Sequence, residues 1–161
     1  MNANFHDLRI TQLGSRSVLA CLSLASRTFG NDSPLFQVVR DFTKEKRSGY
    51  VATIRNCVAG FIICNNRDKD VEQILALAVR KPDRRAGIGG QLLNRVVRLP
   101  RREIIATVDE RSLDIQLFLR SQGFRAVAIE RGTPDSYVFK RTAAHPVTQA
   151  QPSLQTAGVY S

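Results

Sequence analysis

Residues that bind metals or form disulfides are scarce in this sequence. It has three cysteines and two histidines among 161 residues, and no tryptophan. Cys21, Cys57 and Cys64 are odd in number, lie in apolar surroundings and show no Cys-x-x-Cys spacing. This pattern predicts buried thiols and gives no indication of a zinc or redox site. With so few histidines, we expect no metal centre.

Long apolar runs are also missing. No run approaches the roughly 20 residues that a membrane-spanning helix needs. The N-terminal residues have neither a basic start nor an apolar secretory stretch. We therefore expect a soluble, cytoplasmic protein. At 161 residues and 43% hydrophobic, the chain suits a single domain with one buried core.

Acidic side chains are outnumbered by basic ones. The 24 lysines and arginines exceed the 14 aspartates and glutamates, which gives a formal net charge of +10. Such a surface attracts phosphates, acidic peptides or nucleic acid. Charge alone does not choose among these ligands.

One segment differs in composition from the rest. Residues 143–161 contain no Asp, Glu, Lys or Arg, but include two prolines and several Gln, Ser, Thr and Ala residues. Such a segment buries too little apolar area to order itself, so we expect a disordered tail. The folded domain is then expected to span residues 1–142.

The hydrophobic periodicity of this domain predicts a mixed α/β protein, with a sheet and helices on its faces. Alternating or continuous apolar runs favour strands, whereas apolar residues three or four apart favour amphipathic helices. Gly60 lies inside one expected strand and suggests a bulge or a close approach of two backbones. The expected strands are 5–12, 50–54, 58–64, 71–79, 102–108, 125–130 and 137–140, and the expected helices follow Gly14 and Ser33 and span 87–99 and 112–122.

The most informative segment joins the expected strand 71–79 to the helix that follows it. Glycines at 87, 89 and 90 allow the backbone to curl so that several N–H groups converge, and the positive end of the helix dipole adds to them. The segment lacks the GxxxxGK[ST] and GxGxxG patterns of nucleotide-binding loops. It therefore predicts a different socket for a phosphate or diphosphate, surrounded by the basic residues Arg80, Lys81, Arg84 and Arg85.

Two motifs in this half of the chain resemble those of a known family. Arg84, Gly87 and Gly89 fit the pattern Gln/Arg-x-x-Gly-x-Gly/Ala directly after a buried strand. This segment resembles motif A of the GNAT superfamily of N-acetyltransferases, although the family's proline comes one place late, as Pro82. The segment 112–124, which ends in Gly123-Phe124, is similar to motif B of that family.

The resemblance implies a single-domain fold whose sheet is mixed and mostly antiparallel, with two splayed central strands. It also implies that acetyl-CoA, or another acyl-CoA, lies between strands 71–79 and 102–108. The pantetheine arm would pair with the backbone near Leu77 and Val79, and the diphosphate with the loop that follows. The implied cofactor-binding residues are Leu77, Val79, Arg84, Arg85, Ala86, Gly87, Ile88, Gly89 and Gly90.

The implied activity is transfer of an acetyl group to a primary amine by direct attack in a ternary complex. The acceptor would be an amine-bearing small molecule, protein or peptide, and the enzyme a monomer or homodimer. A membrane partner is not expected. Two alternatives stay open: an inactive module that binds acyl-CoA, and a nucleic-acid-binding protein, because the segment 80–102 has eight basic residues and one acidic residue. That segment lacks the interleaved aromatic residues of a single-strand platform.

The catalytic positions of the family are only partly matched. Leu119 stands where the resemblance implies a proton-donating tyrosine, and Gln73 where it implies a glutamate base. Glu72, the neighbour of Gln73, is our candidate for the base; alternatively, it is a solvated or ion-paired carboxylate at a strand end. Strand alternation would put Glu72 on the opposite face from Gln73 unless a bulge re-aims it. Tyr50 and Tyr137 are candidates for the acid, but the sequence does not identify one.

Overall fold

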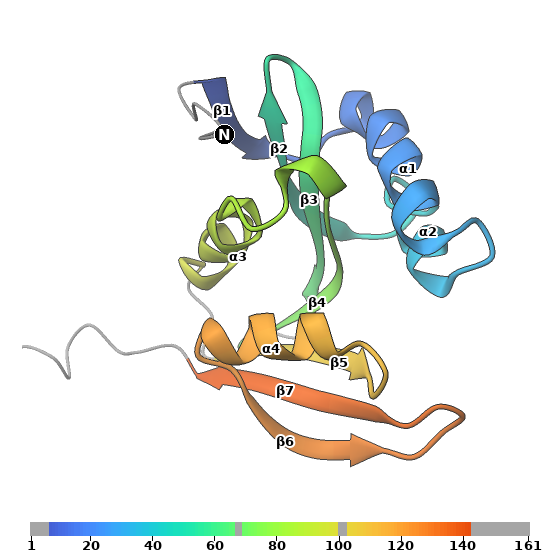
Figure 1. Ribbon diagram of the computed structural model, residues 1–161, viewed down its shortest axis with the longest axis vertical. Helices are drawn as coiled ribbons and strands as arrows, with labels where there is room; N and C mark the ends of the chain where they lie inside the picture. The colour runs from blue at the N-terminus through green and yellow to red at the C-terminus, as the bar shows by residue number, and fades with distance from the viewer. Residues whose placement is uncertain (1–6, 67–68, 100–102, 143–161) are drawn as a thin grey trace, which may run out of the picture.

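A seven-stranded sheet organises the chain, as the computed structural model in Figure 1 shows for residues 7–66, 69–99 and 103–142. The strand order is β1-β2-β3-β4-β5-β7-β6. The strands are β1 (Leu8–Gln12), β2 (Arg47–Ile54), β3 (Cys57–Asn66), β4 (Val71–Val79), β5 (Glu103–Asp109), β6 (Arg125–Glu130) and β7 (Ser136–Thr142). The helices are α1 (Ser15–Phe29), α2 (Pro34–Arg40), α3 (Ile88–Val97) and α4 (Leu113–Ser121). The expected tail 143–161 lies outside the described residues.

The helices begin where local chemistry places them. The hydroxyl of Ser33 accepts a hydrogen bond from the backbone N–H of Leu35 at 3.2 Å, and Pro34 occupies the first turn of α2. This is the expected serine cap followed by proline. Along α1, the residues Val18, Cys21 and Ala25 are buried at helical spacing, so one face of the helix packs on the sheet.

The sheet is antiparallel except where β4 meets β5. These two strands run parallel and pair only from Val71 opposite Glu103 to Ile74 opposite Ala106. Beyond these residues, β4 and β5 do not pair with each other. The mixed, mostly antiparallel sheet with splayed central strands is thus confirmed.

A bulge in β4 lies where the two strands part. On β3, Ile63 is opposite Ala76 and Cys64 is opposite Ile74, which leaves Leu75 as the extra residue. A one-residue insertion exchanges the faces of the side chains that follow it. Accordingly, Ile74 packs in the core under α3 and α4, whereas Ala76 packs in the core under α1 and α2.

Two hydrophobic cores therefore lie on opposite faces of one sheet. One core packs α3 and α4 against the sheet, and Figure 1 shows α1 and α2 on the opposite face. The largest fully buried side chains include Phe139 and Leu92 in the first core and Phe61 in the second. The two cores hold β4 in place from both sides.

Gly60 has both properties that its position in a strand suggested. The β2–β3 register shifts beside it, because Gly60 is opposite Ala52 while Val58 is opposite Thr53. A Cβ atom on Gly60 would lie 2.8 Å from the carbonyl oxygen of Ala78 on β4. Glycine therefore allows β3 and β4 to approach closely just before the loop that follows β4.

Two of the three cysteines are buried. Cys21 and Cys64 are buried, whereas Cys57 is exposed, so the expectation of a buried thiol is wrong for Cys57. Cys57 follows a tight turn in which Arg55 and Asn56 have positive φ, and this turn carries it to the surface. Burial raises the pKa of the Cys21 thiol to about 12 and also raises that of Cys64.

In the described part of the chain, no cluster of three or more His, Cys, Asp or Glu side chains could hold a metal ion. None of its helices has the length and apolar character needed to span a membrane.

Candidate functional site

The candidate site begins in the opening between β4 and β5. Residues Leu75 to Val79 of β4 do not pair with β5. Residues 107–109 of β5 likewise do not pair with β4. A strand edge without a partner presents backbone N–H and C=O groups that can bind an extended ligand. Leu77 and Val79 are half-buried on this stretch and pack against the core under α3 and α4.

The loop after β4 turns the chain sharply into α3. The N–H of Arg80 donates to the carbonyl of Ala59 at 2.7 Å, and a 3₁₀ turn follows at Lys81–Asp83. Arg85 and Gly87 then adopt left-handed φ values of 64° and 82°. The first N–H groups of α3 lack helical partners, and the helix dipole makes this end positive. The turn is therefore suited to bind an anion.

Gly87 is the glycine whose conformation this turn requires. Its left-handed φ favours glycine, and no atom lies within 4 Å of the position that a Cβ would take. The space in front of the turn is open, so a ligand can approach the backbone there. The socket for a phosphate or diphosphate at Gly87 stays a prediction.

Gly89 and Gly90 differ from the expectation that all three glycines curl the backbone. They lie inside α3 without positive φ, so they do not curl the backbone. A Cβ on Gly89 would lie 3.4 Å from the Phe118 ring, and one on Gly90 would lie 3.6 Å from Nε2 of Gln122. At these distances an added methyl group would make ordinary van der Waals contact with α4, so the packing of α4 does not require glycine at either position.

The basic residues of the loop are not all free for a ligand. Arg80 forms a 2.5 Å ion pair with Asp83, a contact that raises the pKa of the guanidinium and keeps it charged. The Nε of Arg84 donates to the carbonyl of Val79 at 2.9 Å, so a ligand must share or displace this contact. Lys81 and Arg85 are exposed beside the turn.

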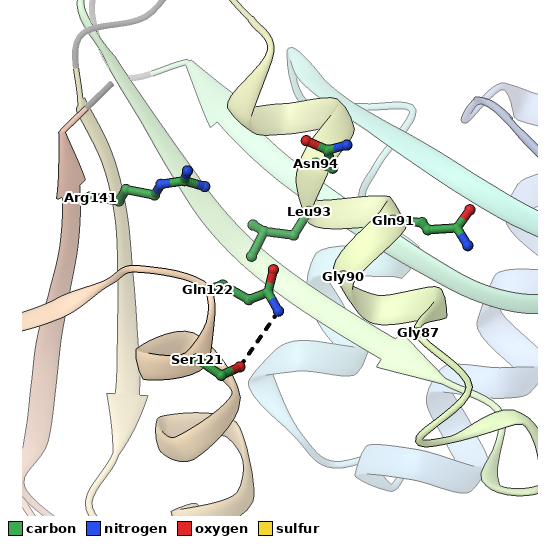
Figure 2. A pocket seen from close by; sticks show the side chains of 8 residues that line it. All are labelled: Gly87, Gly90, Gln91, Leu93, Asn94, Ser121, Gln122 and Arg141. Atoms are coloured by element: carbon green, nitrogen blue, oxygen red, sulfur yellow. Dashed lines mark hydrogen bonds between the residues drawn. The ribbon is translucent and has the colours of Figure 1, made fainter. Parts of the chain in front are cut away.

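A groove of about 640 Å³ continues from the turn between α3, α4 and the end of β7 (Figure 2). The guanidinium of Arg141 enters it from β7, and the amides of Asn94 and Gln122 line its walls. Sequence reasoning missed Arg141, since it lies far from the loop along the chain. Arg141 is opposite Ile104, which belongs to the core under α3 and α4, and residues paired in this way share a face of the sheet. This register places Arg141 on the face that carries α3 and α4.

Glu72, the candidate base, lies at the closed end of the opening. It is 1% exposed, and its Oε1 accepts a hydrogen bond from the hydroxyl of Ser48 at 3.4 Å, among other interactions. A solvated carboxylate is therefore excluded. The assignment of Glu72 as the base stays a prediction.

Among the candidate acids, Tyr137 is better placed than Tyr50. Tyr137 is opposite Val108, in the part of β5 that has separated from β4. Tyr50 is opposite Ile62, so β3 separates it from β4. Leu119 is 2% exposed in the core and has no proton to donate.

The β5 side of the opening is fixed by a buried glutamine. The Nε2 of Gln116 donates to the carbonyls of Asp109 and Glu110, at 3.1 and 2.9 Å. Arg111 also donates to the Asp109 carboxylate, which lowers the pKa of Asp109. These contacts tie the start of α4 to the end of β5.

Comparison by sequence identifies one family. Residues 18–124 match the model of the acetyltransferase (GNAT) family. A comparison with curated proteins gives no match.

Solved acetyltransferase structures resemble the fold. The ribosomal-protein-S18-alanine N-acetyltransferase of Escherichia coli is 18% identical, with a TM-score of 0.72 over 86% of this chain and 95% of that chain. Arabidopsis thaliana NAA60 in complex with acetyl-CoA is 16% identical, with a TM-score of 0.72 over 84% and 98%. An aminoglycoside 6'-N-acetyltransferase complexed with coenzyme A is 14% identical, with a TM-score of 0.73 over 85% and 98%.

Proposed function

Since this chain belongs to the acetyltransferase (GNAT) family, we propose that it transfers the acetyl group of acetyl-CoA to a primary amine by direct attack in a ternary complex. One observation carries the proposal. The opening between β4 and β5 leads directly to a turn whose backbone N–H groups suit a diphosphate. An extended thioester with a diphosphate at one end fits this combination.

The residues present fit acetyl-CoA in two ways. The unpaired edge of β4 at Leu77 and Val79 offers backbone partners for a pantetheine arm, and the open space at Gly87 admits a diphosphate. Residues 84–90 would hold the diphosphate, mainly through their backbone. When bound, acetyl-CoA supplies an activated acetyl group. The complexes of Arabidopsis NAA60 with acetyl-CoA and of the aminoglycoside enzyme with coenzyme A support this choice of ligand.

Direct transfer requires an uncharged amine nitrogen next to the thioester carbonyl carbon. The nitrogen forms the new C–N bond, the C–S bond breaks, the nitrogen loses a proton and the sulfur gains one. In this chain, Leu75 is the extra residue of the bulge, so its backbone lies outside the β3–β4 ladder where β4 leaves β5. Its backbone N–H is our candidate to polarise the thioester carbonyl, and Tyr137 is the candidate to protonate the sulfur.

The acceptor is proposed only as a class: an amine on a small molecule, protein or peptide. The names of the similar structures include an aminoglycoside and a ribosomal-protein alanine as acceptors in those proteins. The net charge of +10 favours an acceptor with acidic or phosphate groups near the amine over a polycation. The cytoplasmic location expected from the sequence stays a prediction.

The activity is tested by measuring release of free CoA thiol from acetyl-CoA with a panel of amines. The panel should include peptide N-termini, peptide lysines, aminoglycosides and polyamines, with mass spectrometry of the product. We expect acetylation of at least one class at a rate well above that of hydrolysis. Binding of acetyl-CoA without product across the whole panel would overturn the proposed transfer and leave a binding module.

Glu72→Gln separates a catalytic role of this residue from a structural one. A general base contributes at least about 100-fold to kcat, and its loss would remove the acidic limb of the pH profile. As the base, Glu72 should give that result; a purely structural Glu72 would instead cost about 1 to 3 kcal/mol of stability, with kcat of the folded protein nearly unchanged. Thermal unfolding and a kcat pH profile give the two readouts, and Asp70→Asn serves as an exposed control.

A further inference from the structure

Large apolar side chains are exposed on α4 and on the edge strand β6. Leu113 and Leu117 of α4 are 64% and 65% exposed, and Val127 and Ile129 of β6 are 57% and 50% exposed. We call these four residues the α4/β6 surface. Exposed apolar residues that cluster in this way mark an interaction site more often than scattered ones do.

The leucines lie on the flank of α4 that faces the edge of the sheet. Gln116 and Leu119 face the interior, and Phe118 lies toward α3, where it approaches Gly89. At 100° per residue, Leu113 and Leu117 fall on the flank opposite Phe118. Figure 1 shows α4 between α3 and the edge strand β6, so this flank faces outward beside β6.

The strand β6 ends the sheet in the described part of the chain. It pairs with β7 on one side only, and all six of its residues are exposed. Its charged residues, Arg125 and Glu130, stand at its two ends, with only alanine, valine and isoleucine between them. An apolar edge without charges in its middle is a template for another strand.

We propose that two copies of this chain associate through the outer edges of their β6 strands, in an antiparallel pair around a two-fold axis. This arrangement sets Arg125 of each copy opposite Glu130 of the other, so the strand is complementary in charge to itself. The axis passes through the middle of β6, where apolar residues meet. The interface is isologous and closes at two copies.

The directions of the side chains agree with this register. On β7, Lys140 and Ser136 share one face, and these residues are opposite Arg125 and Glu130 of β6. Arg125 and Glu130 therefore point to the same face, as residues paired across two strands must. The register shift between Ala126 and Ala128 makes this possible, because without it residues five positions apart would point to opposite faces.

The inner pair of the same register obeys the same rule. Ala126 is opposite Phe139, and Ile129 is opposite Tyr137, so Ala126 and Ile129 share the face that carries α4. Each Ala126 would meet Ile129 of the second copy beneath the two α4 helices. The leucine flanks of those helices would then face each other across the axis. The same register thus pairs the charged residues with each other and the apolar residues with each other.

The test is the mass of the full chain in solution at physiological ionic strength, by sedimentation velocity over a wide range of protein concentration. We expect a dimer. Arg125→Glu sets two carboxylates against each other at both ends of the interface, and Glu130→Arg does the same with two guanidinium groups. Each variant should raise the dissociation constant of the dimer at least about tenfold, because attraction becomes repulsion at two symmetric pairs.

Combining the variants gives the decisive controls. The double variant Arg125→Glu/Glu130→Arg restores both pairs, so it should dimerise like the original chain. An equal mixture of the two single variants should form heterodimers, because every pair across the axis is then complementary. Circular dichroism of each single variant confirms that it is folded.

Two results would overturn the proposal. One is a monomer at all concentrations, which would leave the α4/β6 surface to another occupant such as residues 143–161 or a different protein. The other is a dimer that neither charge reversal weakens, which would place the interface elsewhere. Neither result depends on the proposed acetyl transfer.

Discussion

Gly87→Glu is expected to abolish the thermal stabilisation of this protein by acetyl-CoA. A ligand selective for the folded state, at one hundredfold its Kd, adds about 2.7 kcal/mol of stability. For a chain of this size, that corresponds to a rise in Tm of roughly 5 to 10 °C. A glutamate at position 87 puts a carboxylate in the open space before α3, where the diphosphate is proposed to lie. Differential scanning fluorimetry with increasing acetyl-CoA measures the effect.

Gly30→Glu controls for the charge that this substitution adds. Gly30 ends α1 with a φ of 84°, close to the 82° of Gly87, and both positions have no atom within 4 Å of a Cβ. Both variants carry the same added charge at a positive φ, but Gly30 has a ψ of 153° against 3° at Gly87, so Gly30→Glu is the more strained of the two. Only Gly87→Glu should lose the response to acetyl-CoA. Equal responses from both variants would show that the turn does not bind the coenzyme.

Gly60→Ala is expected to cause the largest loss of stability from a single methyl group near the site. The new Cβ would lie 2.8 Å from the Ala78 carbonyl oxygen, which belongs to the backbone of the central strand β4. A buried backbone cannot yield cheaply, so we expect a destabilisation of about 3 kcal/mol, at the upper end for overpacking. Urea unfolding at equilibrium measures this loss.

Gly60→Ala should also weaken acetyl-CoA binding, since Ala78 precedes Val79 at the end of β4 and a shift there would be transmitted to the loop. Gly14→Ala adds the same methyl group at the N-cap of α1, where nothing lies within 4 Å and φ is −121°. We expect that control to change stability by less than about 1 kcal/mol. Equal effects of the two variants would contradict the close approach of β3 and β4.

The order of elements was predictable because each begins or ends with a strong local signal. Ser33-Pro34 starts α2, the apolar run of β4 leads into glycines that open α3, and Gly123 follows α4. These signals act over a few residues, so the sequence alone displays them. The loop at Gly87 was predictable for the same reason, since the left-handed φ of Gly87 is a local property.

The features that escaped prediction depend on pairing across strands. The position of the bulge at Leu75 and the place of Arg141 beside α3 are both set by register, which local periodicity does not encode. The position of α4 beside Gly89 and Gly90 is likewise a tertiary property. Local signals therefore predicted the turn at Gly87 and the start of α3. The residues that line the groove beside them could be found only from the fold.

A crystal structure of this chain with coenzyme A tests the proposed cofactor site most directly. We expect the diphosphate to accept hydrogen bonds from backbone N–H groups of residues 85–90. We also expect the pantetheine arm to lie against β4 at Leu77 and Val79, between the separated parts of β4 and β5. Coenzyme bound elsewhere, with β4 and β5 paired along their full length and the turn at Gly87 empty, would contradict the proposed site.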